Sequence, residues 1–120
     1  MRYILMICTD EAAELAQSPA ENDTMSADYF AFVDEMNRRG VLQGGERLRP
    51  TTDATSVRVQ NGEVLTSDGP FAETKEQIGG YFVVDCKDLD DAIAVAAKIP
   101  GAKRGVIEVR PIWELGAPTA

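Results

Sequence analysis

The stretch YFVVDCKDLDDAIAVAAKIPGAKRGVIEVRP, residues 81–111, decides the fold. Residues 81–86 form an apolar, β-branched run typical of a buried strand. Asp88 can cap a helix whose first turn holds further acidic residues, and Pro100 ends it. Residues 106–110 then alternate apolar and charged side chains, which predicts a second strand. We expect the helix to bury Leu89, Ile93, Ala96 and Ala97.

The amino-terminal half repeats this strand–helix–strand order. Residues 3–8 predict a buried strand, and residues 41–49 predict another that Gly44-Gly45 weakens by a bulge or a close backbone approach. Between them, apolar residues recur at helical spacing before Gly40, with Thr24 or Ser26 as the cap. That helical stripe consists of Met25, Tyr29, Phe32, Val33 and Met36. Residues 10–24, interrupted by Ser18-Pro19, are interpreted as a mobile insertion.

A hairpin lies between the two halves. Residues 54–60 alternate, Asn61-Gly62 is a strong signal for a tight turn with positive φ, and residues 63–66 return. The whole order predicts an α+β, ferredoxin-like βαββαβ fold with an inserted hairpin and two helices on one face of an antiparallel sheet. We expect one domain over residues 1–120, with residues 115–120 as a tail.

Two helices can cover only one face of such a sheet. The apolar positions expected to point to the helices are Tyr3, Leu5, Ile7, Val57, Val59, Ile107 and Val109. The other face would carry a mixture of apolar and charged side chains, namely Arg2, Ile4, Met6, Cys8, Arg58, Glu108 and Arg110. Such a face is poorly suited to water and is often covered by its own copy, so we expect a homodimer.

The composition excludes several classes of function. A chain of 120 residues with 44% apolar content fits one soluble core, and its apolar runs are too short for a membrane span. The net charge of −8 opposes direct binding of nucleic acid or of an anionic membrane. With no histidine, and two cysteines without CxxC spacing, we expect no metal, no cofactor and reduced thiols in the cytoplasm.

The segment DGPFAETKE, residues 68–76, concentrates charge beside a rigid turn. Glycine permits positive φ and proline fixes its own φ, so Gly69-Pro70 would hold the Asp68 carboxylate in one place. Two interpretations follow: Asp68 caps the turn and the other charges are solvated, or the loop presents charged groups to a cleft.

The longer stretch DGPFAETKEQIGGY, residues 68–81, resembles the YCII-like family in its branch marked by the Asp-Gly-Pro-Phe signature. Residues 40–48, 55–58, 90–97 and 108–111 agree as well, so the resemblance covers nearly the whole chain. It implies a ferredoxin-like, dimeric α/β-barrel type of fold with a ligand cleft, in a group described as candidate enzymes or companions of sigma factors. The family's catalytic histidine has no counterpart here.

Three functions follow from these observations. The first is a homodimer with a charged cleft that binds a small, anionic metabolite. The second is an acid–base enzyme, with Asp68 and Glu76 as the catalytic candidates. The third is a regulatory companion of a sigma factor, since an acidic surface suits a basic protein. The candidate ligand-binding residues are Arg58, Phe71, Glu73, Lys75, Glu108 and Arg110, the two arginines pairing with an anion.

Overall fold

The computed structural model describes residues 1–116; the rest of the predicted tail, residues 117–120, lies outside the described residues. Its principal elements are, in chain order, β1 (Arg2–Asp10), α1 (Glu11–Leu15), α2 (Pro19–Arg38), β2 (Leu42–Arg47), β3 (Thr55–Gln60), β4 (Glu63–Asp68), β5 (Glu76–Asp85), α3 (Leu89–Ala97) and β6 (Val106–Pro111). Short 3-10 turns occupy Thr51–Asp53 and Pro100–Lys103.

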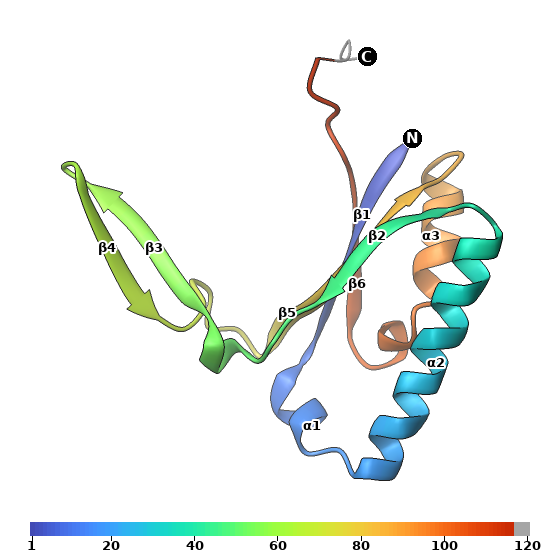
Figure 1. The fold of residues 1–120 in the computed structure, drawn as a ribbon, viewed down its shortest axis with the longest axis horizontal. Coiled ribbons are helices and arrows are strands. Elements are labelled where there is room, and N and C mark those ends of the chain that lie inside the picture. Colours follow the sequence, from blue (N-terminus) through green and yellow to red (C-terminus); the bar gives the residue numbers. More distant parts are fainter. Residues whose placement is uncertain (117–120) are drawn as a thin grey trace.

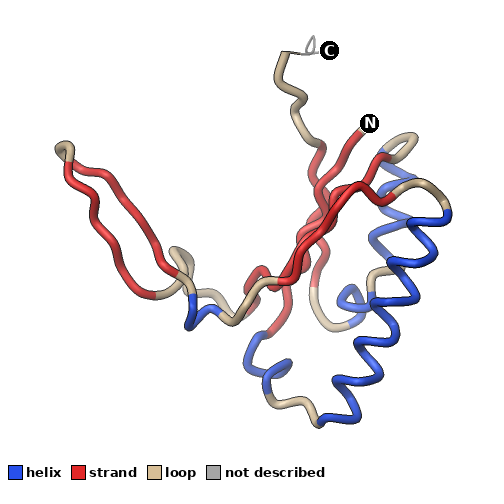
Figure 2. Tube along the Cα trace, viewed as in Figure 1, coloured by secondary structure: helices blue, strands red, loops and turns tan. Residues whose placement is uncertain are grey.

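Four strands form one antiparallel sheet in the order β2-β5-β1-β6. The helices α2 and α3 lie on the same side of this sheet (Figures 1 and 2). Without the inserted β3–β4 pair, the strand order and the two helices are those of a ferredoxin-like fold, which confirms the predicted fold class. The register shifts between Leu42 and Gly44, so the predicted weakness at the glycine pair is confirmed as a bulge.

The core lies between the sheet and the two helices. Along β1 every second residue is buried, because successive side chains of a strand point to opposite faces. Tyr3, Leu5 and Ile7 meet Phe32 and Met36 of α2 in this core, as the helical stripe predicts. We call the other face of the four-stranded sheet, away from α2 and α3, the open face.

The helix α2 begins earlier than the sequence predicted, and most of residues 10–24 are helical. Ser18 is its cap: the Ser18 hydroxyl accepts from the Glu21 amide at 3.1 Å, and the Glu21 carboxylate accepts from the Ser18 amide at 3.2 Å. Pro19 occupies the first turn, where its missing N–H costs nothing. The predicted cap at Thr24 or Ser26 was therefore wrong.

The buried stripe of α3 also differs from the prediction. Leu89, Ile93 and Ala97 are exposed, and Ala96 alone of the predicted set is buried. The helix buries Ala92, Val95 and Ala96 instead. These three residues belong to the same core cluster as the buried residues of β1 and α2.

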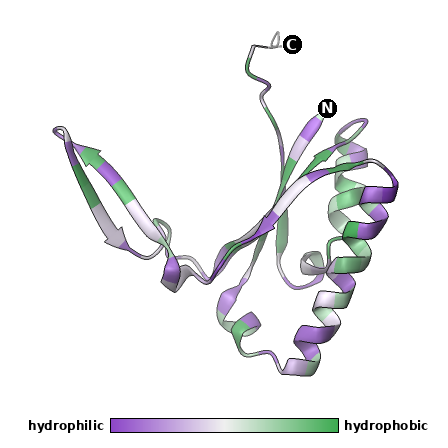
Figure 3. Ribbon diagram, in the orientation of Figure 1, coloured by the Kyte–Doolittle hydropathy of each residue, from purple (hydrophilic) through white to green (hydrophobic). Residues whose placement is uncertain are grey.

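The hairpin stands apart from the sheet and projects away from the helices (Figure 1). Its strands β3 and β4 pair only with each other, and we call residues 55–68 the arm. Its turn is as predicted, with positive φ at Asn61 and Gly62. Val57 and Val59 do not point to the helices; both are exposed on the arm, where Figure 3 shows hydrophobic stretches.

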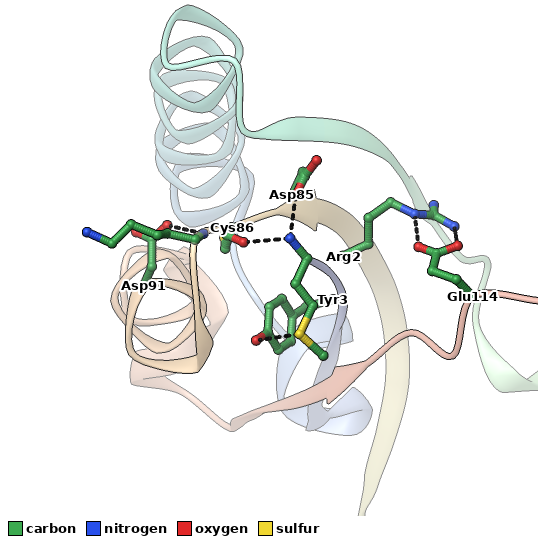
Figure 4. A network of polar contacts seen from close by, with 8 residues as sticks. Arg2, Tyr3, Asp85, Cys86, Asp91 and Glu114 are labelled. Atoms are coloured by element: carbon green, nitrogen blue, oxygen red, sulfur yellow. Dashed lines mark hydrogen bonds and ion pairs between the residues drawn. The ribbon is translucent and has the colours of Figure 1, made fainter. Parts of the chain in front are cut away.

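Both ends of the described chain are tied to the sheet (Figure 4). The terminal ammonium of Met1 donates to the Asp85 carboxylate at 2.9 Å and to the Cys86 carbonyl at 3.0 Å. Arg2 donates to the Glu114 carboxylate through two nitrogens, at 2.6 and 3.0 Å. Among residues 1–116, no helix is long and apolar enough to cross a membrane.

Candidate functional site

A cavity of about 500 Å³ lies between the amino-terminal half of α2 and the sheet. Its floor is formed where β1 and β2 end and β5 begins, and α1 contributes one wall. The apolar and aromatic lining residues are Ile7, Met25, Tyr29, Phe30, Val33, Tyr81 and Phe82. The polar ones are Thr9, Glu14, Asn22, Ser26, Glu46 and Arg47. A volume of this size accommodates a small metabolite.

Three glycines keep the floor of the cavity free of side chains: Gly45, Gly79 and Gly80. A Cβ at Gly80 would lie 2.9 Å from the Glu46 carbonyl oxygen, and one at Gly45 would lie 2.5 Å from a ring carbon of Phe82. A Cβ at Gly79 would meet only the Thr9 hydroxyl, at 4.0 Å. The glycine pairs therefore let β2 approach β5 closely and leave room beside Thr9.

Arg47 provides the positive charge of the cavity. It is the last residue of β2, opposite Gly80, and it makes no ion pair with any residue in the range 1–116. Arg49, two residues further on, differs because its guanidinium bonds Asp53 at 2.8 Å. Arg47 is thus free to bind an anion through two parallel hydrogen bonds.

Tyr29 places a hydroxyl on the wall of the cavity. Burial raises the pKa of this phenol, and the nearby Glu14 charge raises it further, against the Gly101 amide and two arginines that lower it. The hydroxyl therefore stays protonated at neutral pH and can donate a hydrogen bond to a ligand.

Three of the residues predicted as site residues lie at the arm. Arg58 of β3 stacks over the ring of Phe71 at 5.1 Å, and the Phe71 side chain is otherwise exposed. Asp68 ends β4, and its carboxylate makes no hydrogen bond to any described residue. The turn is held instead by Gly69, whose amide donates to the Ala54 carbonyl and whose carbonyl accepts from the Ser56 hydroxyl, both at 2.8 Å.

The remaining predicted residues lie beside the start of β5 and on the open face. Glu73 is exposed in the loop before β5, and the Lys75 ammonium is 3.9 Å from the Asp10 carboxylate. Glu108 and Arg110 of β6 form an ion pair with each other. In the sheet, Arg110 is opposite Ile4 of β1, Glu108 is opposite Met6, and Glu76 is opposite Asp10.

Cys8 lies near two of these residues, Glu108 and Glu76. Burial raises the pKa of its thiol, and the charges of Glu108 and Glu76 raise it further, which places both carboxylates near this half-buried cysteine of β1. Cys86 is buried, and burial raises its pKa as well. Both thiols are free, as the sequence indicated.

Within one chain, the predicted residues do not come together in a single cleft. None of the eight lines the cavity, because they divide among the arm, the loop between β4 and β5, the first residue of β5 and the edge strand β6. Sequence reasoning missed Arg47, Tyr29 and Glu14. The sequence signal for this site was the two glycine pairs, 44–45 and 79–80. The first pair precedes Arg47 on β2, and Gly80 of the second is opposite Arg47 on β5. Among the described residues, no cluster of three or more acidic or cysteine side chains could hold a metal ion.

The fold and the cavity define an α+β, ferredoxin-like protein with a pocket of metabolite size on the helical side of its sheet. The chain belongs to the YCII-related family, whose domain profile matches residues 1–116. It is similar to an uncharacterized protein of Rhizobium meliloti (strain 1021), with 38% identity over 114 residues that cover 93% of this chain and 92% of the relative.

Proposed function

We propose that the protein is a homodimer that binds a small anionic metabolite in the cavity beneath α2. The observation that carries the proposal is Arg47, an arginine without a carboxylate partner in the described chain, on the wall of a largely apolar cavity of about 500 Å³. Pockets of this size and character, with a few convergent polar groups, are typical binding sites for small molecules.

The lining defines the chemistry of the ligand. The guanidinium of Arg47 matches a carboxylate or a phosphate in planar geometry, and the Tyr29 hydroxyl supplies a neutral donor. Phe30 and Met25 offer apolar surface on the opposite wall, from α2. A ligand with one anionic group and an apolar or aromatic body would satisfy all of these groups.

The ligand proposal is tested by a thermal shift screen of carboxylates and phosphate esters, with binding constants from calorimetry. A ligand at a hundred times its dissociation constant should add about 2.7 kcal/mol of stability. Arg47→Gln should weaken binding at least tenfold, because it removes the only cation of the cavity lining. Arg49→Gln removes the same charge two residues away and is the matched control; equal losses in both variants would contradict the proposed site.

The open face supports the homodimer. Its central residues Ile4, Met6 and Cys8 are only half-buried, and the neighbouring strands add the exposed side chains of Ile78 and Val106 beside Cys8. Covering this face with a second copy of the chain would remove that apolar surface from water. Light scattering at micromolar concentration should give a dimer mass, and Met6→Asp should dissociate or unfold the protein. A monomer mass for wild type would contradict the dimer.

The two other functions stay predictions. The acid–base reaction assigned to Asp68 gains no support from the cavity, since Asp68 is exposed at the arm and does not line it. A sigma factor as partner is testable by co-purification of the intact chain.

A further inference from the structure

The described chain exposes more surface than a closed monomer of its size. A compact 13.0 kDa protein exposes roughly 6,300 Å², whereas this chain exposes 8487 Å². Its radius of gyration is 16.5 Å, against about 14 Å for a compact domain of the same length. The arm contributes to the extended shape, because it projects from the rest of the molecule, as the segment after β6 also does (Figure 1).

The arm has one face that carries its valines and one mainly polar face. Register pairing places Val57, Val59 and Val64 together on one side, and their exposed fractions are 61%, 68% and 69%. Arg58, Gln60 and Glu63 lie on the other side, together with Leu65, which is 43% exposed. This alternation is typical of a strand pair whose apolar face packs against another surface.

The same chain does not supply the surface that the valines need. The arm is a separate two-stranded sheet, with no strand pairing to the four-stranded sheet. A two-stranded hairpin with an uncovered apolar face is marginally stable at best in water. The arm therefore lacks a partner in the described monomer.

We propose that the valine face of the arm, Val57, Val59 and Val64, packs against a second copy of this chain. The excess surface of about 2,100 Å² per chain, to which the arm contributes, is comparable in size to what each partner buries in a large permanent dimer. A second copy also offers the open face of its sheet, where Ile78 and Val106 are exposed. In a two-fold dimer each of these two surfaces is used twice. The inference rests on the homodimer proposed above and assigns the arm to its interface.

Two neighbouring substitutions on β3 test this assignment in the full-length protein. Val59→Asp places a charge on the valine face, and Gln60→Asp places the same charge on the polar face one residue away. Sedimentation equilibrium should show the dimer dissociation constant raised at least tenfold by Val59→Asp and changed less than twofold by Gln60→Asp. Circular dichroism of each variant reports whether its subunit stays folded.

Hydrogen exchange on the wild type covers the case in which Val59→Asp unfolds. The amides of β3 and β4 should become more protected as the protein concentration passes through the dissociation constant, and the core amides of β1 should stay protected throughout. A wild-type dimer in which both variants retain its dissociation constant, or in which arm protection is independent of concentration, would overturn the role of the arm and leave the dimer intact. A wild-type monomer would overturn both.

Discussion

Gly101 packs directly against Tyr29: a Cβ at position 101 would lie 2.8 Å from the phenol oxygen and 3.0 Å from a methyl carbon of Ile7. Position 101 belongs to the 3-10 turn after α3, and Tyr29 belongs to α2. The contact therefore couples the second half of the fold to the wall of the cavity.

We expect Gly101→Ala to lower the free energy of unfolding by about 1–3 kcal/mol, as overpacking does in a well-filled interior. Tyr29→Phe removes the oxygen that the new methyl group would meet, so the alanine should cost less in the Tyr29→Phe background. Denaturant unfolding of the two single variants and the double variant measures this coupling. Strictly additive costs would show that the two residues do not press on each other.

The start of α2 is tested by two helix substitutions. Ser18→Ala removes the capping box and should cost about 1 kcal/mol. Thr24→Ala changes a hydroxyl that bonds the Ala20 carbonyl within the helix, and it should be nearly neutral because alanine has the higher helix propensity. Thermal unfolding distinguishes the two; a larger cost at Thr24 would restore the later start of the helix.

The turn after β4 should depend on Gly69 rather than on the Asp68 side chain. Gly69 has φ +94°, a conformation that costs other residues about 1–2 kcal/mol. Gly69→Ala should therefore lower the protection of the amide at position 69, which bonds the Ala54 carbonyl, by a factor of about 5–30.

Asp68→Ala and Asp68→Asn should leave that protection almost unchanged, since the carboxylate accepts no hydrogen bond within the described chain. Hydrogen exchange at position 69 is the measurement for all three variants. Protection lost in the alanine variant and kept in the asparagine variant would show that Asp68 caps the turn after all.

Glu35 should add a pH-dependent contribution to stability. Its hydrogen bond from Lys98 at 2.8 Å, with Arg39 also near, lowers the pKa of the Glu35 carboxyl below the usual 4.5. Because the folded pKa is depressed, the contribution is present above pH 4.5 and is lost as the pH falls through the folded pKa. The stability difference between wild type and Glu35→Gln, from denaturant unfolding between pH 3 and pH 7, should shrink toward the acid end. A constant difference would contradict the linkage.

Much of the fold could be predicted because most of its elements follow from patterns in neighbouring residues. The alternation of β1, the stripe from Met25 to Met36 and the turn at Asn61-Gly62 each fix an element from its own residues. The start of α2 was also local: Ser18, Pro19 and Glu21 are a capping box with proline in the first turn. Ser18-Pro19 was interpreted only as an interruption: it does separate α1 from α2, but proline is also favourable in the first turn of the helix that follows.

The candidate site could be predicted only in part. Arg58 stacks over Phe71, and Asp68 is the last residue of β4 in the same segment of the chain. Arg47 and Tyr29 are separated in sequence and meet at the cavity only because β2 and α2 pass on either side of it. No sequence spacing relates these two residues. The high density of charge in residues 68–76 therefore made that segment the predicted site.

The sequence by itself determined the order of the main strands and helices, and with it the ferredoxin-like topology, since periodicity and turn chemistry act over a few residues. The tertiary structure alone decided which surface each apolar face meets. The valines of the arm and those of the sheet alternate in the same way, yet β3 and β4 pair only with each other and remain exposed. An alternating pattern indicates that one face of a strand is apolar. Which surface covers that face depends on how the strands pair over long distances in the chain.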